Sequence, residues 1–287
     1  MTSAPILSIV LPARDESAGL RRILPQLCER FAGEEIIVVN DGSTDDTVDV
    51  CAAFPVRVIS HPYPKGNGAA IKTGVHAARG RILATMDADG QHDPADIRRL
   101  IDRYETGYHM VVGARNAGSQ ASWGRLLANK IYNWVASWMV GQRVADLTSG
   151  LRVANADKFR EFMHLLPNGF SYPTTITMSF FRAGYSVAYE PIQASEREGR
   201  SHINLLRDGA RFLLIIFKIG TLYSPLKMFV PISALHFLVG LSYYGYTYVN
   251  YGRFTNMSAL LLITSVLIFL IGLVSEQITS LIYQSKR

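Results

Sequence analysis

The chain has 287 residues, 48% of them hydrophobic and 18% charged, with a formal net charge of +6. This length accommodates one sizeable α/β domain and an appendage. The positive charge gathers late in the chain and suits phosphate ligands or an anionic lipid surface, and no nucleic-acid-binding motif accompanies it. Cys28 and Cys51 lack metal-ligand spacing, as expected in a reducing compartment. The N-terminus lacks the basic region and long apolar core of a signal peptide.

Short apolar runs alternate with segments of helical spacing in the first part of the chain. Length and β-branched content predict that these runs are buried strands, at Ile6–Leu11, Glu35–Val39, Val56–Ser60, Ile82–Met86 and His109–Gly113. Helices are predicted at Ser17–Phe31, at Asp46–Ala53, from the turn at residues 62–70 to near Gly80, from Asp93-Pro94 onward, and at Trp123–Val140. This alternation predicts an α/β fold with a mostly parallel, doubly wound sheet.

Polar residues follow three of the predicted strands directly, in the stretches Pro12–Glu16, Asn40–Ser43 and Asp87–Gln91. In a parallel sheet the carboxyl ends of the strands meet at one edge, where such folds bind their ligands. Turn formation explains any one of these stretches, but the three together indicate a binding site. The sequence around Lys65, P-K-G-N-G, is neither a P-loop nor a dinucleotide-binding fingerprint. We therefore expect phosphates to be held by a metal and by side chains.

Two carboxylates one residue apart, Asp87 and Asp89, end the apolar run Ile82–Met86. Hard divalent cations take oxygen ligands and tolerate a largely hydrated shell. The pair therefore predicts a divalent-metal site. A cation held there would neutralise a diphosphate and stabilise it as a leaving group.

Motifs spread from the first predicted strand to the stretch before the apolar C-terminal part resemble glycosyltransferase family 2. They are SIVLPARDE, IIVVNDGSTDDT, KGNGAA, MDADGQHDP, VVGARN, DLTSGLR and EREGRSH. Within that family they are similar to the polyprenyl-phosphate glycosyltransferases, the group of dolichol-phosphate mannose synthase and its bacterial undecaprenyl-phosphate relatives. The resemblance implies a GT-A fold (Rossmann-like), a nucleotide-sugar donor, Mg²⁺ or Mn²⁺, and inversion at the anomeric carbon.

The resemblance also assigns a nucleotide-sugar site and a metal site residue by residue. The nucleotide-sugar site comprises Pro12, Arg14, Glu16, Val39, Asp41, Lys65, Asp87, Ala88 and Asp89. In this assignment Asp41 accepts a hydrogen bond from the base or ribose, and Ala88 lies beside the donor. The metal ligands are Asp87, Asp89 and Gln91. Arg14-Asp15 stands where the family commonly has an aromatic residue or asparagine, which leaves the base of the donor, a UDP- or GDP-sugar, open.

The candidate catalytic residues are Asp89, Arg115, Arg125, Asp146, Arg197 and Arg200. Arg115 and Arg125 would hold the acceptor phosphate, although Asn129 replaces a hydroxyl residue that the family often has. The stretch Ser195–His202 would be a loop that closes over the donor, with a solvated linker as the alternative. A phosphate monoester is mostly a dianion at neutral pH, so a general base is not required. Asp146 is then a candidate base or orienting residue, with a turn or cap role as the alternative.

Charges become rare in the last part of the chain. Asn204–Thr221 carries basic residues on one helical side, which predicts an interfacial helix on a membrane, or alternatively an ordinary packed helix. Met228–Gly252 and Phe254–Ser275 contain no Asp, Glu, Lys or Arg. Each is long enough to span a bilayer, and their short polar link predicts a hairpin, with a buried pair of core helices as the alternative.

The chain is therefore predicted to have three parts: a catalytic domain over residues 1–200, an interfacial region over residues 201–226, and a transmembrane hairpin over residues 227–287, with spans near 228–250 and 256–278. Lys and Arg flank the open side of the hairpin. The positive-inside rule then places its two ends and the catalytic domain in the cytoplasm, at the inner membrane.

Three hypotheses for function follow. The first is an inverting transferase that moves one sugar from a nucleotide-sugar to undecaprenyl or dolichyl phosphate on the cytoplasmic face of the membrane. The second is a transferase with another lipid acceptor, such as a diacylglycerol. The third is a non-catalytic membrane partner that binds nucleotide-sugars. The resemblance also implies assembly into homo-oligomers through the membrane helices.

Overall fold

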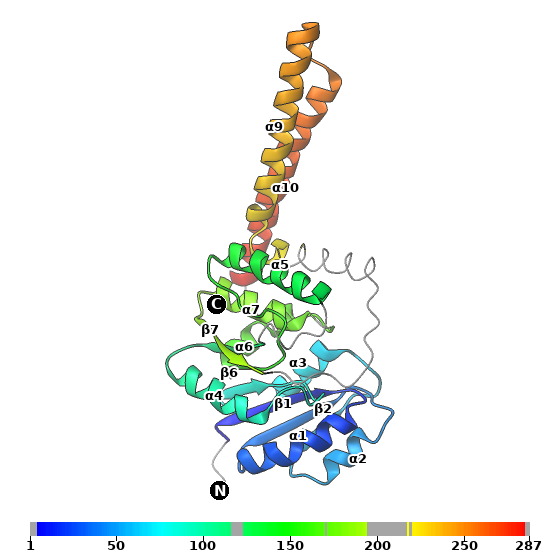
Figure 1. The fold of residues 1–287 in the computed structure, drawn as a ribbon, viewed down its shortest axis with the longest axis vertical. Coiled ribbons are helices and arrows are strands. Elements are labelled where there is room, and N and C mark those ends of the chain that lie inside the picture. Colours follow the sequence, from blue (N-terminus) through cyan, green and yellow to red (C-terminus); the bar gives the residue numbers. More distant parts are fainter. Residues whose placement is uncertain (1–4, 116–122, 170, 194–216, 218–219, 285–287) are drawn as a thin grey trace. The chain divides into compact units, whose positions relative to one another are not determined.

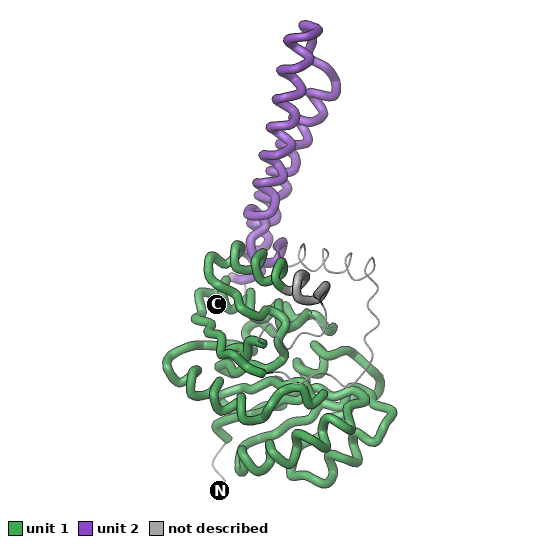
Figure 2. Tube along the Cα trace, in the orientation of Figure 1, with its two compact units in different colours: residues 1–205 green, residues 206–287 purple. Residues whose placement is uncertain are grey.

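The computed structural model describes residues 5–115, 123–169, 171–193, 217 and 220–284. The chain divides into two compact units, residues 1–205 and residues 206–287, which Figure 2 colours separately. Unit 1 contains all the strands and the shorter helices. Unit 2 contains two long apolar helices.

Unit 1 is built on one sheet of seven strands in the order β3-β2-β1-β4-β6-β5-β7 (Figure 1). The strands are β1 (Leu7–Ala13), β2 (Glu35–Asn40), β3 (Arg57–Ser60), β4 (Ile82–Thr85), β5 (Met110–Arg115), β6 (Arg152–Asn155) and β7 (Val187–Ile192). Neighbouring strands are parallel except at β6, which is antiparallel to both β4 and β5. The predicted mostly parallel, doubly wound sheet is confirmed.

The helices of unit 1 cover both faces of this sheet. They are α1 (Ser17–Arg30), α2 (Thr47–Ala52), α3 (Asn67–Ala77), α4 (Pro94–Glu105), α5 (Trp123–Val140), α6 (Ala156–Glu161) and α7 (Tyr172–Arg182). Buried residues of α1, α2 and α4 share one apolar cluster with alternate residues of β1 and β2. Helix α3 packs on the opposite face, because a Cβ added at Gly74 would overlap the side chain of Val10, which points away from that cluster.

Local sequence explains where the helices lie. In α1, Leu20, Ile23, Leu24 and Leu27 recur at helical spacing and are all buried. Helix α4 begins where Asp93 accepts a hydrogen bond from the Ala95 amide at 2.8 Å. The following proline fits the first helical turn, where its missing amide hydrogen costs nothing. This cap fixes the start of α4 directly after the predicted metal-binding stretch.

The strand β6 was not predicted. It has only four residues and follows a motif, DLTSGLR, that reads as a polar turn, so its alternation is too short to detect. Because β6 runs against its neighbours, its first residue, Arg152, pairs with Thr85 at the carboxyl end of β4. The segment before β6 therefore reaches the edge where the other strands end.

Unit 2 is a helical hairpin of α9 (Pro225–Tyr251) and α10 (Asn256–Gln284). Helix α9 ends at Gly252, whose φ of 59° is a left-handed conformation that glycine adopts without strain. The Ser233 hydroxyl donates to the Ser265 carbonyl at 2.7 Å, so the two helices also share a hydrogen bond. The predicted hairpin is confirmed.

The hairpin has the composition of membrane-spanning helices. Two helices in the described part of the chain are long and apolar enough to cross a membrane, with mean hydropathy 1.4 for Pro225–Tyr251 and 2.7 for Asn256–Tyr283. Only 6% and 17% of their most apolar windows are buried, which argues against a pair of core helices. The predicted interfacial helix, Asn204–Thr221, falls mostly outside the described residues.

Candidate active site

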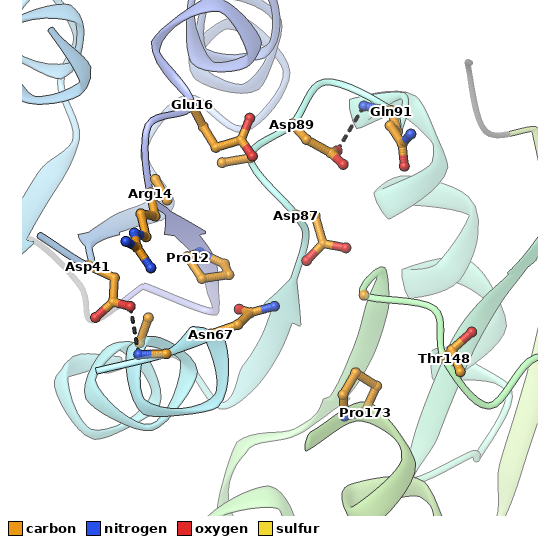
Figure 3. A pocket seen from close by; sticks show the side chains of 15 residues that line it. Pro12, Arg14, Glu16, Asp41, Asn67, Asp87, Asp89, Gln91, Thr148 and Pro173 are labelled. Carbon is orange, nitrogen blue, oxygen red and sulfur yellow. Dashed lines mark hydrogen bonds between the residues drawn. The ribbon is translucent and has the colours of Figure 1, made fainter. Parts of the chain in front are cut away.

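A cavity of about 430 Å³ opens at the carboxyl ends of β1, β2 and β4. Its lining residues are Pro12, Ala13, Arg14, Glu16, Asp41, Gly66, Asn67, Ala70, Asp87, Ala88, Asp89, Gln91, Thr148, Gly150 and Pro173. Figure 3 shows the side chains of Asp87 and Asp89 on one side of this pocket and those of Arg14 and Asp41 on the other. The three stretches that the sequence placed at one edge therefore do line one pocket.

Asp87 and Asp89 follow β4 and are both partly exposed to the pocket. Asp89 accepts a hydrogen bond from the Gln91 amide at 3.1 Å, which folds the chain back toward the carboxylates. The Asp87 side chain is 35% exposed, and its nearest ion-pair partner, His92 Nε2, is 4.0 Å from Oδ2. Burial, and then the neighbouring charge of Asp89, raise the pKa of Asp87 above its usual value, against the opposing effect of His92.

This donor set fits a hard divalent cation. Two carboxylates and the Gln91 amide offer oxygen atoms at one end of the pocket, and magnesium-like ions typically take one or two carboxylates together with phosphates and water. No group of three or more His, Cys, Asp or Glu side chains arranged for a metal occurs among the described residues. The buried His92 Nδ1 has no hydrogen-bond partner, so the polar surroundings of Asp87 are incompletely satisfied by protein atoms.

Asp41, across the pocket, differs from Asp87 because its carboxylate has several hydrogen-bond partners. Its carboxylate accepts hydrogen bonds from the amides of Lys65 (2.8 Å) and Gly66 (2.7 Å) and lies 2.7 Å from His61 Nδ1. Burial alone would raise the pKa of Asp41, but these hydrogen bonds outweigh it and hold the pKa below its usual value. His61 Nε2 in turn lies 2.9 Å from the Thr73 hydroxyl of α3. Asp41 therefore joins the end of β2 to the loop that begins α3.

The remaining predicted donor residues differ in their positions. Pro12, Arg14 and Glu16 line the pocket where β1 ends, and Ala88 lies between the two aspartates. Val39 is fully buried in β2, and Lys65 is exposed with its ammonium 5.7 Å from the centre of the Tyr63 ring. Neither lines the pocket, although the Lys65 amide supports Asp41.

Arg115, which is partly exposed, forms an ion pair with the buried Asp146 beside this pocket. Arg115 Nε and Nη2 donate to the two oxygens of Asp146 at 2.8 and 3.1 Å, and Nη2 also donates to the Thr148 hydroxyl. Burial would raise the pKa of Asp146, but Arg115 and the Thr148 amide hold it below its usual value. An ionised carboxylate engaged in this way orients Arg115 and is a weak base.

Arg115 also lines a second cavity, of about 440 Å³, together with two further basic residues, Lys130 and Arg143. Arg125 belongs to α5, but its side chain lies outside the described residues, as do Arg197 and Arg200. Of the four arginines predicted to be catalytic, only Arg115 has a side chain among the described residues.

Several pocket residues were missed by the sequence analysis as site residues. Asn67, Thr148 and Gly150 stand inside motifs that were recognised, KGNGAA and DLTSGLR, so their position was the available signal. Pro173 is the second residue of α7, far along the chain, and had no local signal. His61 supports Asp41 but is an isolated histidine in sequence.

A doubly wound sheet with an acidic pocket at its strand ends is the architecture of a GT-A glycosyltransferase. The chain belongs to the family described as Glycosyl transferase family 2, which matches residues 8–178, more than half of its length. Residues 224–281 match a second family, described as GtrB C-terminal hairpin. The predicted family and fold are confirmed, the protein is a glycosyltransferase, and its hairpin indicates association with a membrane.

Curated relatives extend this result. The chain is 28% identical over 205 residues to a polyprenol monophosphomannose synthase of Mycolicibacterium smegmatis, covering 66% of this chain and 77% of the relative. It is 27% identical over 214 residues to an undecaprenyl-phosphate 4-deoxy-4-formamido-L-arabinose transferase of Edwardsiella ictaluri, covering 70% of this chain and 64% of the relative.

Among solved structures, glucosyl-3-phosphoglycerate synthase of Mycobacterium tuberculosis superposes with a TM-score of 0.61 at 23% identity. The match covers 76% of this chain and 79% of that one. That enzyme was crystallised with Mn²⁺ and UDP in one complex and with Mg²⁺ and UDP in another. The likeness supports the GT-A fold of unit 1.

Proposed function

We propose that this protein transfers a single sugar from a nucleotide-sugar to polyprenyl phosphate at a membrane surface. The observation that carries the proposal is the acidic pocket of a family 2 glycosyltransferase in the same chain as a hairpin of membrane-spanning length. Relatives named for polyprenol and undecaprenyl phosphate support this acceptor. A lipid acceptor also gives the hairpin a purpose that a water-soluble acceptor would not.

The proposed donor site is the 430 Å³ cavity, which is large enough for a sugar nucleotide. Pro12, Arg14 and Glu16 line the part proposed for base and ribose, with Asp41 at its edge. The UDP bound in a GT-A neighbour supports a nucleotide-sugar donor, a UDP- or GDP-sugar. Asp87, Asp89 and Gln91 are the proposed ligands of Mg²⁺ or Mn²⁺, and Lys65 and Val39 act through the backbone around Asp41.

When bound, the cation would supply positive charge to the departing nucleoside diphosphate. The chain itself positions the two reacting anions. Arg115, held by Asp146, presents its guanidinium to the acceptor phosphate, which is largely dianionic at neutral pH and needs no proton removed. Arg125, Arg197 and Arg200 complete this cationic surface in the proposal. One phosphate oxygen forms the new bond to the anomeric carbon as the diphosphate leaves from the opposite side, which inverts the configuration.

The membrane topology is part of the proposal. Residues 201–226 would lie at the interface and residues 227–287 would form the anchor, with the catalytic domain on the cytoplasmic face of the inner membrane. Homo-oligomers would assemble through the hairpin.

The test is a transfer assay on the full chain in detergent. Undecaprenyl phosphate and diacylglycerol are supplied separately with labelled UDP- and GDP-sugars and Mn²⁺ or Mg²⁺. We expect product on undecaprenyl phosphate alone, and only with a divalent cation. Product on diacylglycerol alone would replace the proposed acceptor. Donor binding without any product across the whole panel would support a non-catalytic binding partner instead.

A further inference from the structure

Arg152, the first residue of β6, is an unusual buried charge. It is 1% exposed and is among the largest side chains that are fully buried in the described residues. A buried guanidinium normally requires a carboxylate partner, because desolvating a charge is costly. None of the ion pairs formed by the described residues includes Arg152. Its charge therefore needs another explanation.

The hydrogen bonds of Arg152 go to neutral acceptors in two segments of the pocket wall. Nη1 donates to the Pro173 carbonyl at 2.9 Å and to the Thr177 hydroxyl at 3.2 Å, and Nη2 donates to the Ser149 carbonyl. Pro173 lines the pocket itself, and Ser149 lies between two lining residues. The guanidinium thus ties the start of α7 to the segment that precedes β6.

The same segment lies directly against the metal-site carboxylate. A Cβ added at Gly150 would overlap the carboxylate atoms of Asp87, so this glycine leaves the space that Asp87 occupies. The Gly150 carbonyl accepts a hydrogen bond from the Thr85 hydroxyl at 2.9 Å, and Thr85 pairs with Arg152 across the sheet. Gly150 therefore connects Asp87, which it contacts, to Arg152, which lies two residues further along the chain.

Polar atoms without a partner gather around this arginine. Its own Nε and the Ser149 hydroxyl are buried and make no hydrogen bond, and the Tyr172 ring lies 5.9 Å from the guanidinium. Burial lowers the pKa of Arg152, and the charges of Asp146 and Asp87 are among those that oppose this effect. The carboxylates that favour the charged form of Arg152 therefore belong to the site.

We propose that Arg152 is a positioning residue that supplies a permanent positive charge beneath the Asp87–Asp89 pair and limits how tightly the pair holds a divalent cation. This inference rests on the proposed function. The buried charge offsets part of the repulsion between the carboxylates before the cation arrives. It also repels the cation, which favours arrival with the donor diphosphate and departure with the product. The three hydrogen bonds separately fix the wall segments.

The experiment separates charge from hydrogen bonding by measuring cation affinity. Mn²⁺ binding to the full chain in detergent, without donor, is followed by thermal shift and by titration calorimetry. Arg152→Gln removes the charge, and Arg152→Lys keeps it but loses the planar fork. Arg152→Met is a second neutral variant, in which an apolar side chain of similar length replaces the guanidinium. Arg99→Gln is the matched control, since Arg99 is half exposed and pairs with Asp96 and Glu190.

We expect the neutral variants to bind Mn²⁺ about tenfold more tightly than the wild type, as an order of magnitude for removing one nearby like charge. Arg152→Lys and Arg99→Gln should bind within about twofold of the wild type. Transfer should slow in both Arg152→Gln and Arg152→Lys, because both loosen the wall.

Unchanged or weaker Mn²⁺ binding in both neutral variants would overturn the inference and leave the proposed function intact. A wild-type protein that binds no divalent cation, with or without UDP, would overturn both.

Discussion

Asp41 and Asp87 occupy equivalent places in the sheet, at the carboxyl ends of the two strands that flank β1, yet their surroundings are opposite. Asp41 is enclosed by His61 and two backbone amides, and its pKa is lowered. Asp87 has one ion-pair partner, His92, at 4.0 Å, and burial raises its pKa. A satisfied carboxylate stabilises the fold, whereas one whose charge the protein compensates only in part is suited to a ligand. This contrast separates the structural side of the pocket from its chemical side.

The largest effect is expected at the chemical side. Asp87→Asn and Asp89→Ala should each lower transfer about a thousandfold or more, because several kcal/mol of leaving-group stabilisation depend on the cation. Asp87→Asn should also raise the melting temperature of the cation-free protein, since it removes a charge that folding disfavours. Transfer assays and thermal melts in EDTA check both statements, with the exposed Asp102→Asn as control. Near-normal turnover in either variant would exclude the metal role.

On the structural side of the pocket, Asp41→Asn should destabilise the protein, whereas Asp87→Asn should stabilise it. The variant loses a buried acceptor of several hydrogen bonds, which should cost about 2–3 kcal/mol of unfolding free energy. Denaturant unfolding measures the loss, and Asp49→Asn, on the exposed surface of α2, is the matched control. A stable Asp41 variant with abolished donor binding would instead give Asp41 a direct role toward the nucleotide.

Asp146→Asn tests the acceptor side. Loss of one of the paired bonds and of the ionic charge opposite Arg115 should lower kcat/KM for the lipid acceptor about tenfold to a hundredfold, since a less firmly oriented guanidinium holds phosphate less well. The KM for the nucleotide-sugar should stay the same. Steady-state kinetics with each substrate varied in turn give the answer, and the exposed Asp157→Asn serves as control. Equal effects on both substrates would argue that Asp146 supports the whole pocket.

The smallest effect is the pH dependence of stability in EDTA. The raised pKa of Asp87 means that folding gains stability as pH falls through it, with the gain complete below the unfolded value of about 3.9. The lowered pKa of Asp41 contributes stability above about 3.9, which is lost as pH falls through the folded-state pKa. As the pH is lowered, the difference in melting temperature between Asp87→Asn and the wild type should therefore disappear at a higher pH than the difference between Asp41→Asn and the wild type. Thermal melts across this range measure both, and parallel pH profiles would contradict the contrast.

The sequence predicted the parts of the fold that have strong local signals. Helix α5 was predicted with its observed bounds, and the carboxylates Asp87 and Asp89 were found because they interrupt an apolar run at a strand end. It did not predict the support of the site. Arg152 and Pro173 act through contacts between segments far apart in the chain, and β6 is too short for its period to be visible.

His61 shows the same limit at the level of one side chain. Its role depends on a contact with Asp41, twenty positions earlier, and on a second contact with Thr73 of α3. Neither neighbour could be inferred from spacing, because both contacts depend on how β2, β3 and α3 come together. Local pattern identifies groups that bind ligands, while their supports become visible only after packing.

The reversed direction of β6 has a consequence for how such enzymes diversify. Around the pocket, Arg14, Asp41 and Asp87 come from chain leaving the sheet, whereas Thr148 and Gly150 come from chain about to enter it. Insertions ahead of Asp146 can therefore reshape one wall without altering the segments that follow β1, β2 and β4. In the proposed function, this arrangement would let recognition of the recipient molecule evolve separately from binding of the activated sugar.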